Sequence, residues 1–139
     1  MTAIAGLRLK LLPQPFTVSR FAPEAELPTQ LWQRSWVFVA RTDEELSLVC
    51  PTALLDEEAL EPAQREDDWR AFKVQGPLAF ELVGILAGIS ASLADASISL
   101  FAVSTYDTDY VLVQNADLAA SVTALEAAGG EVLPEAPDG

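Results

Sequence analysis

The feature that most constrains the fold is an ordered change of hydrophobic period in the second half of the chain. Apolar residues that favour β-structure predict strands at 69–74, 98–103, 110–113 and 131–133. Between them, apolar residues recur at helical spacing, first at Ile85, Leu86, Ile89 and Leu93 and then at Leu118, Val122 and Leu125. The resulting order, β-α-β-β-α-β, is the ferredoxin-like plan, an α+β fold with helices on one face of an antiparallel sheet.

Polar residues and glycines mark where the second of these helices begins and ends. Asn115 is its expected N-cap, and Asp117 complements the positive end of the helix dipole. Gly129 and Gly130 follow its last apolar turn and predict a left-handed cap. The tail, residues 134–139, is expected to be loose.

The first half predicts a smaller set of elements. We expect strands at 7–11, 16–20, 36–40 and 46–50 and a short helix at 29–34. The run 36–40 is almost continuously apolar, which is typical of a strand buried on both faces. The acidic stretch 56–68 contains Pro62, and we interpret it as a connection or a weak helix.

Two hairpins occupy corresponding places in the two halves. Residues 37–49 and 100–113 each predict a strand, a polar turn and a second strand. The sequence therefore predicts two modules of similar plan, an N-terminal module at 1–68 that is reduced in its helices and a complete C-terminal module at 69–139.

Composition excludes several classes of partner. The chain of 139 residues carries 21 acidic and 8 basic side chains and a net charge of −13, so it would repel nucleic acids and anionic membranes. The apolar stretch 80–89 is too short to span a bilayer, and the N-terminus lacks the pattern of a secretory signal. The single cysteine, Cys50, cannot form an internal disulfide, which fits a reducing cytoplasm.

Catalysis and metal binding find little support in the residue types. The chain has no histidine for acid–base work, and Cys50 lies in an apolar strand with no base to activate it. One cysteine and no histidine also disfavour transition metals, and neither an EF-hand spacing nor a phosphate-binding glycine motif is present. We expect a protein that is not an enzyme and has no cofactor.

Three stretches of the second half together resemble an ACT domain: residues 84–86, 98–101 and the run Ser-Thr-Tyr-Asp-Thr-Asp-Tyr-Val-Leu-Val at 104–113. Within that superfamily they are similar to a subgroup shared by animal cytosolic arginine sensors and many uncharacterised bacterial proteins. Residues 41–51 resemble the matching hairpin of the preceding module, so the resemblance covers roughly residues 7–133. Ser97 departs from the family pattern, which usually has glycine after the first helix.

The resemblance implies that a ligand lies near the start of the first helix and along the following strand and turn. On this sequence the implied ligand-binding residues are Gly84, Ile85, Leu86, Ser104, Thr105, Tyr106, Asp107 and Asp109. The backbone N–H groups after Gly84 suit a carboxylate, and the two aspartates suit an ammonium or guanidinium group. The residues alone allow plainer roles, a turn glycine and ordinary turn aspartates, and Phe101 is expected to be core.

The resemblance also implies a regulatory function. ACT domains typically bind amino acids where two modules meet, and the ligand alters an attached enzyme or a partner. We expect a homodimer that binds a small molecule of the amino-acid class and acts through a protein partner. The alternative is a protein-interaction or oligomerisation module that has kept the fold without a ligand.

Overall fold

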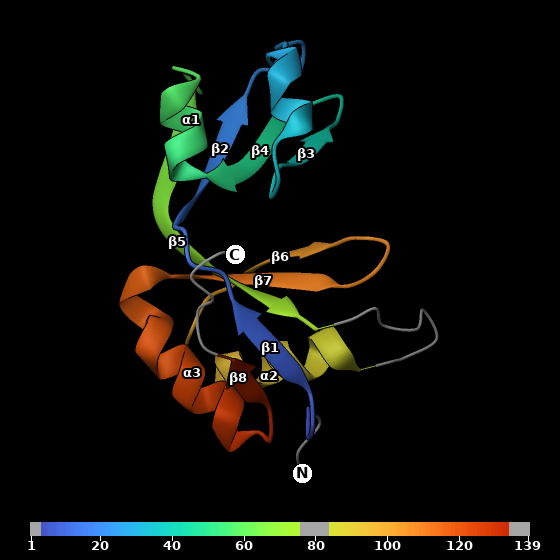
Figure 1. Cartoon of the computed structure of the whole chain (residues 1–139), viewed down its shortest axis with the longest axis vertical. Coiled ribbons are helices and arrows are strands. Elements are labelled where there is room, and N and C mark those ends of the chain that lie inside the picture. Colours follow the sequence, from blue (N-terminus) through green and yellow to red (C-terminus); the bar gives the residue numbers. More distant parts are fainter. Residues whose placement is uncertain (1–3, 76–83, 134–139) are drawn as a thin grey trace. The chain divides into compact units, whose positions relative to one another are not determined.

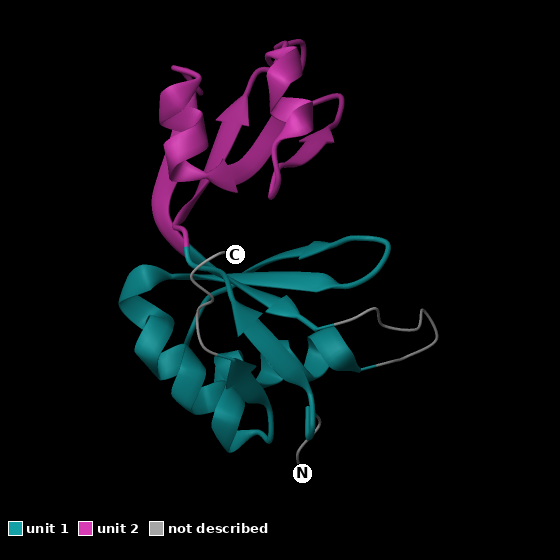
Figure 2. Ribbon diagram, in the orientation of Figure 1, with its two compact units in different colours: residues 1–13, 70–139 teal, residues 14–69 magenta. Residues whose placement is uncertain are grey.

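The structure is a computed structural model that describes residues 4–75 and 84–133. The chain forms two compact units (Figure 2). Unit 1 contains Met1–Pro13 and Arg70–Gly139, and unit 2 contains Gln14–Trp69. Each unit has its own hydrophobic core. The strand β5 (Gln64–Val74) supplies its first half to unit 2 and its second half to unit 1.

Unit 2 has the predicted βαββαβ plan with a reduced first helix. Its elements are β2 (Phe16–Phe21), the 3-10 helix η1 (Thr29–Gln33), β3 (Phe38–Arg41), β4 (Leu46–Pro51), α1 (Thr52–Glu57) and the first half of β5. The strands are antiparallel in the order β3-β4-β2-β5 (Figure 1). The buried residues of its core come from alternate positions of the strands and from the helices, namely Phe21, Leu31, Leu46, Leu48, Cys50, Leu54 and Leu55.

Unit 1 has the complete plan and one strand more. Its elements are β1 (Arg8–Leu11), the second half of β5, α2 (Ile85–Asp95), β6 (Phe101–Ser104), β7 (Asp109–Gln114), the 3-10 helix η2 (Asn115–Asp117), α3 (Leu118–Ala127) and β8 (Glu131–Leu133). The core includes Leu9, Phe72, Val74, Ile89, Leu93, Val111, Val113 and Leu125. The predicted fold class, ferredoxin-like modules with a reduced first module, is confirmed.

The additional strand is β1, which lies between β5 and β8. Leu9 is opposite Val74 in an antiparallel pair and opposite Val132 in a parallel pair. The sheet of unit 1 therefore has the order β8-β1-β5-β7-β6. The expected boundary, 1–68 against 69–139, differs from the observed units at this point, because residues 1–13 belong with the C-terminal half. The alternation of this strand was predicted correctly, but alternation does not say which sheet a strand joins.

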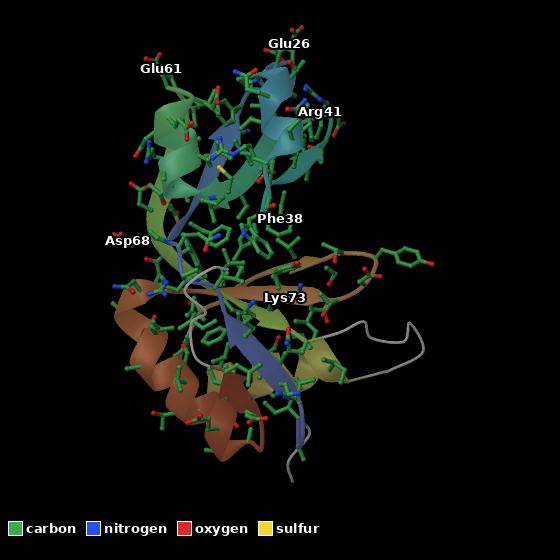
Figure 3. The ribbon with its side chains drawn as sticks, in the orientation of Figure 1. Glu26, Phe38, Arg41, Glu61, Asp68 and Lys73 are labelled. Atoms are coloured by element: carbon green, nitrogen blue, oxygen red, sulfur yellow. The ribbon has the colours of Figure 1, made fainter. Side chains whose placement is uncertain are left out.

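The interpretation of 56–68 as a connection or weak helix is wrong for the last five residues of this segment. Residues 64–68 are strand, paired with β2, and all five are exposed. Charged side chains are common on the outer strand of a sheet, where they discourage pairing with other chains. The register shifts by one residue opposite Thr17, where Asp67 and Asp68 form a β-bulge and Asp68 has a φ of 69°. Asp68 projects outward from β5 (Figure 3).

The expectation of a strand at 36–40 buried on both faces is also wrong. Trp36 lies outside the strand with a φ of 67°, and β3 begins at Phe38. β3 is an outer strand that pairs with β4, and its residues are half-buried or exposed. Arg41, at its end, donates hydrogen bonds to the carbonyl oxygens of Pro23 and Ala25 and so holds the loop after β2 (Figure 3).

The helix ends show one error and one agreement. Asn115 is not the N-cap of α3, because residues 115–117 form η2 and α3 begins after Asp117 without a side-chain cap. Gly129 does adopt a left-handed φ of 102°, and the amide of Gly130 donates to the carbonyl of Leu125. Ser97, at the position where the family has glycine, adopts the φ of 61° that glycine favours.

Some expectations concern residues outside those described. The tail at 134–139 and the first part of the apolar stretch, 80–83, belong to this group. Across the described residues, every helix is too short or too polar to cross a bilayer.

Candidate functional site

Gly84 is positioned immediately before the first turn of α2. Its φ of 85° is left-handed, and a Cβ built on it would meet nothing within 4 Å. Its carbonyl accepts a 2.8 Å hydrogen bond from the amide of Gly88. Among the described residues, no side chain caps α2, so the first amides of this helix lack a side-chain acceptor there.

Ile85 and Leu86 play a mainly structural part. Both side chains are half-buried and pack against the core of unit 1. Their side chains are therefore committed to the fold, and the chemistry that they offer at the start of α2 comes from the backbone. This outcome limits the predicted role of these two residues to their N–H groups.

Threonine hydroxyl groups form hydrogen bonds that stabilise the turn between β6 and β7. The amide and the hydroxyl of Thr105 both donate to the carbonyl oxygen of Thr108, at 2.8 Å and 3.1 Å. The buried hydroxyl of Thr108 donates at 2.6 Å to the carbonyl of Val74 in β5. Thr108, which sequence reasoning did not select, therefore fixes the turn against the sheet of unit 1.

The carboxylate of Asp109 has a defined orientation in this turn. Ser104 donates a hydrogen bond of 2.6 Å from its hydroxyl to Oδ1 of Asp109. The two residues face each other at the last pair of the β6–β7 ladder. A carboxylate accepts several hydrogen bonds, so the bond from Ser104 orients this group without using all of its capacity.

The tip of the same turn is open to solvent. Tyr106 is 81% exposed, and Asp107 beside it is also exposed. The pKa of Tyr110 is raised, first by burial and then by the negative charge of Asp107. Phe101, expected in the core, is half-buried on β6.

The eight predicted residues thus form two groups in unit 1. Ser104, Thr105, Tyr106, Asp107 and Asp109 share one turn, whereas residues 84–86 share the beginning of α2. Among the hydrogen bonds described above, the one between Ser104 and Asp109 joins two of these eight residues, and none of them links the two groups. Their shared role as one ligand site remains a prediction.

A polar network in unit 2 was not anticipated from the sequence. Thr17 is fully buried and donates at 2.7 Å to Oδ1 of Asp67, and its oxygen lies 2.7 Å from the hydroxyl of Thr52. Arg65 donates to the same carboxylate at 2.9 Å and to Asp56 at 3.3 Å. The pKa of Asp67 is lowered, first by the hydrogen bond from Thr17 and then by Arg65. Only the bulge in β5 brings these residues together, so sequence spacing gives no signal of it.

Each unit also has an open cavity. In unit 1 a groove of about 420 Å³ runs between α2 and α3 and is lined by small residues such as Gly88, Ala91 and Ala124. In unit 2 a cavity of about 430 Å³ is lined by Gln14, Gln33, Arg34, Ser35, Trp36, Pro51, Ala53 and Leu54. None of the eight predicted residues lines either of these two cavities.

The described residues offer little of the chemistry that catalysis requires. Within 4–75 and 84–133, no three His, Cys, Asp or Glu side chains gather as a metal site would need. Burial raises the pKa of Cys50 to about 11, so at neutral pH this side chain is an inert thiol rather than a nucleophile.

The chain is similar both to a family of protein domains and to several proteins of known structure. The sequence model of the ACT domain matches residues 64–127, which run from β5 to the end of α3. None of the curated proteins matches the sequence. Among solved structures, protein Atu0741 of Agobacterium tumefaciens is 32% identical over 94% of both chains, with a TM-score of 0.80. Residues 64–127 therefore match an ACT domain, and the chain belongs to the same family as Atu0741.

More distant structures share the fold. VC0802 of Vibrio cholerae, described as a protein of unknown function and possible transport protein, is 20% identical over 88% of this chain and 90% of its own, with a TM-score of 0.68. The regulatory subunit of aspartate kinase from Thermus thermophilus is 12% identical over 84% and 93%, with a TM-score of 0.60. An ACT domain is generally a regulatory module that binds a ligand, which agrees with the coarse expectation for this chain.

Proposed function

We propose that this chain is a non-catalytic sensing protein that binds an amino acid through the beginning of α2 and the β6–β7 turn of unit 1. The proposal includes a homodimer, so that the ligand lies where two modules meet. A cytoplasmic protein partner would respond to the ligand. The buried free thiol of Cys50 is compatible with such a reducing compartment.

The observation that carries the proposal is the beginning of α2. Gly84 has a left-handed backbone, open space at its missing Cβ and no side-chain cap above the helix. A helix of eleven residues begins there, and its first N–H groups together with the helix dipole favour a carboxylate. Every amino acid carries an α-carboxylate that could bind there.

The turn supplies the complementary charge. The half-buried Asp109 is oriented by Ser104, and Asp107, two residues away, adds a second carboxylate that is exposed. A ligand ammonium or guanidinium group would form charge-assisted hydrogen bonds with these carboxylates, which are stronger than neutral ones. The pair of carboxylates favours a basic ligand over an acidic one.

One observation favours the alternative, a protein-interaction module that has kept the fold without a ligand. Ile85 and Leu86 pack into the core, and Asp109 already accepts a hydrogen bond from Ser104. These contacts are also what a purely structural hairpin and helix would make. Under this alternative the oligomer itself is the function, and its stability is indifferent to metabolites.

A thermal-shift screen of the twenty amino acids on unfolded and refolded protein tests the sensor. A ligand at about 100 times its dissociation constant adds roughly 2.7 kcal/mol, which raises the midpoint of a domain of this size by roughly 5–10 °C. Asp109→Ala should reduce that shift. The matched control is Asp43→Ala in the β3–β4 turn of unit 2, which should leave it unchanged.

The two candidates give different outcomes in this screen. If no amino acid shifts the midpoint, the sensor is rejected. A dimer that persists at micromolar concentration by light scattering, in the absence of any ligand response, then supports the interaction module. A clean monomer under the same conditions counts against that module.

A further inference from the structure

The cavity of unit 2 lies where three separate segments meet. Gln33 and Arg34 come from the end of η1, Trp36 from the turn before β3, and Pro51 and Leu54 from the junction of β4 with α1. Gln14 closes the cavity from the segment before β2. Its volume of about 430 Å³ falls in the range of about 300–1,000 Å³ that is usual for small-molecule sites.

The polar part of the lining is Gln14, Gln33, Arg34 and Ser35, of which Arg34 is the charged residue. Arg34 lies 3.5 Å from Glu57 in an ion pair whose side chains are 46% and 59% exposed. An exposed ion pair of this kind is worth little, and a guanidinium has five N–H donors, so it can receive a second anion. The amides of Gln14 and Gln33 add further donors, and the cavity has no acidic residue in its lining.

The apolar part of the lining is Trp36, Pro51 and Leu54. Trp36 is held at a φ of 67°, a conformation that a bulky aromatic residue rarely adopts. Such a conformation costs on the order of 1–3 kcal/mol and persists where the surrounding structure enforces it, often at ligand sites. Trp36 thus lies in the wall of the cavity, two residues after Arg34.

We propose that this cavity binds a small organic carboxylate with a compact aromatic group. The carboxylate pairs with Arg34, with help from the two glutamine amides, and the aromatic group packs against Trp36 and Pro51. A cationic ligand is disfavoured, because the lining supplies a positive charge and no carboxylate. This site is separate in sequence and in chemistry from the one proposed at α2 and the β6–β7 turn, and it does not depend on that proposal.

The test is titration of the full chain with benzoate, followed by calorimetry and tryptophan fluorescence. Benzylamine and benzyl alcohol, which carry the same ring with a positive charge or none, are the matched probes. We expect benzoate to bind at least about tenfold more tightly than either, which corresponds to about 1.4 kcal/mol. No binding of benzoate, or equal binding of benzylamine, would overturn the proposal.

Two variants locate the site. Arg34→Gln should weaken benzoate binding at least about tenfold, because the charge-assisted pair is lost. Arg8→Gln is the control: Arg8 forms a comparable exposed ion pair with Glu131 but lies in unit 1, and benzoate binding should not change. Equal weakening by both variants would mean a general charge effect and would reject the site.

The tryptophan fluorescence of the Trp36→Phe variant tests whether the ligand lies beside Trp36. This variant should bind benzoate but lose the fluorescence response, while its thermal midpoint shows that it is folded. A response that persists would place the ligand near Trp32 or Trp69 and reject the cavity. Asp109→Ala should leave benzoate binding intact, so failure of the sensor proposal and failure of this one are distinguishable.

Discussion

The buried hydroxyl of Thr17 donates a 2.7 Å hydrogen bond to the carboxylate of Asp67. Because a hydroxyl has a single hydrogen, the 2.7 Å contact between Thr17 and Thr52 requires Thr52 to donate to Thr17. The chain of hydrogen bonds therefore runs from the first residue of α1, through β2, to the bulge of β5. It connects three elements of unit 2 around one negative charge.

Thr17→Val should lower the free energy of unfolding at pH 7 by about 1–2 kcal/mol, because it removes a hydrogen bond to a charged group and leaves Thr52 without its acceptor. Thr17→Ser keeps the hydroxyl and should retain most of the stability. Urea unfolding followed by circular dichroism measures both. Equal stability of Thr17→Val and the parent chain would contradict the network.

The same bond predicts a pH dependence with a definite sign. The folded pKa of Asp67 is lowered, so its contribution to stability is complete above the unfolded value of about 3.9 and is lost as the pH falls through the folded value. Between pH 6 and pH 3 the parent chain should lose more stability than Thr17→Val. Unfolding curves at half-unit intervals give the comparison, and parallel losses would disprove it.

Ser97→Gly should stabilise the chain by about 1 kcal/mol, because glycine adopts a left-handed conformation without the steric cost that other residues carry. Ser97 has a φ of 61° and is exposed, so little packing is lost. Ser90→Gly, the same change inside α2, should instead cost about 0.5 kcal/mol. Thermal and urea unfolding distinguish the two; a loss of stability in both would contradict the assigned cap.

Gly130→Ala should destabilise unit 1 by about 1–3 kcal/mol through overpacking. A Cβ at this position would lie 3.1 Å from Cδ1 of Ile4 and 3.2 Å from both Leu9 Cδ1 and the carbonyl oxygen of Leu125. Ile4→Val removes the nearest of these atoms, so the cost of Gly130→Ala should be smaller in that background. A double-mutant cycle measures the difference, and strict additivity would argue against the contact.

Cys50 should react with a thiol reagent only as the chain unfolds. Its pKa of about 11 leaves the native thiolate fraction at pH 8 on the order of 100-fold below that of a free cysteine, whose pKa is about 8.5. Its rate of labelling should rise with urea in step with the loss of structure. Rapid labelling without urea would show that the core of unit 2 opens locally.

Periodicity predicted the helices and most strands, because the cores of both units are built from regularly spaced apolar residues such as Ile89, Leu93 and Leu125. It failed where a strand is defined by backbone pairing with its neighbour rather than by burial of apolar side chains. Residues 64–68 are strand although all are exposed, because their backbone pairs with β2. The apolar run after Trp36 lies at an outer strand, which local sequence cannot distinguish from a central one.

The candidate site was less predictable than the fold. The spacing of Ser104, Thr105 and Thr108 encodes a turn held by hydroxyl groups, and the structure has those bonds. Whether the turn and the start of α2 serve one ligand depends on how modules meet, which one chain's spacing does not specify. The cavity around Trp36 could not be predicted from the sequence, because its lining comes from segments that only folding brings together.

The position of β1 between β5 and β8 has a consequence for biosynthesis. The first strand of unit 1 emerges from the ribosome long before its partners, and the whole of unit 2 is translated in between. Unit 2 can complete its sheet once residue 69 has emerged, whereas β1 must wait for β5 and then for β8 at the other end of the chain. Domains generally fold as their sequences become available, so the strand of unit 1 that is translated first is among the last of that unit to complete its pairing.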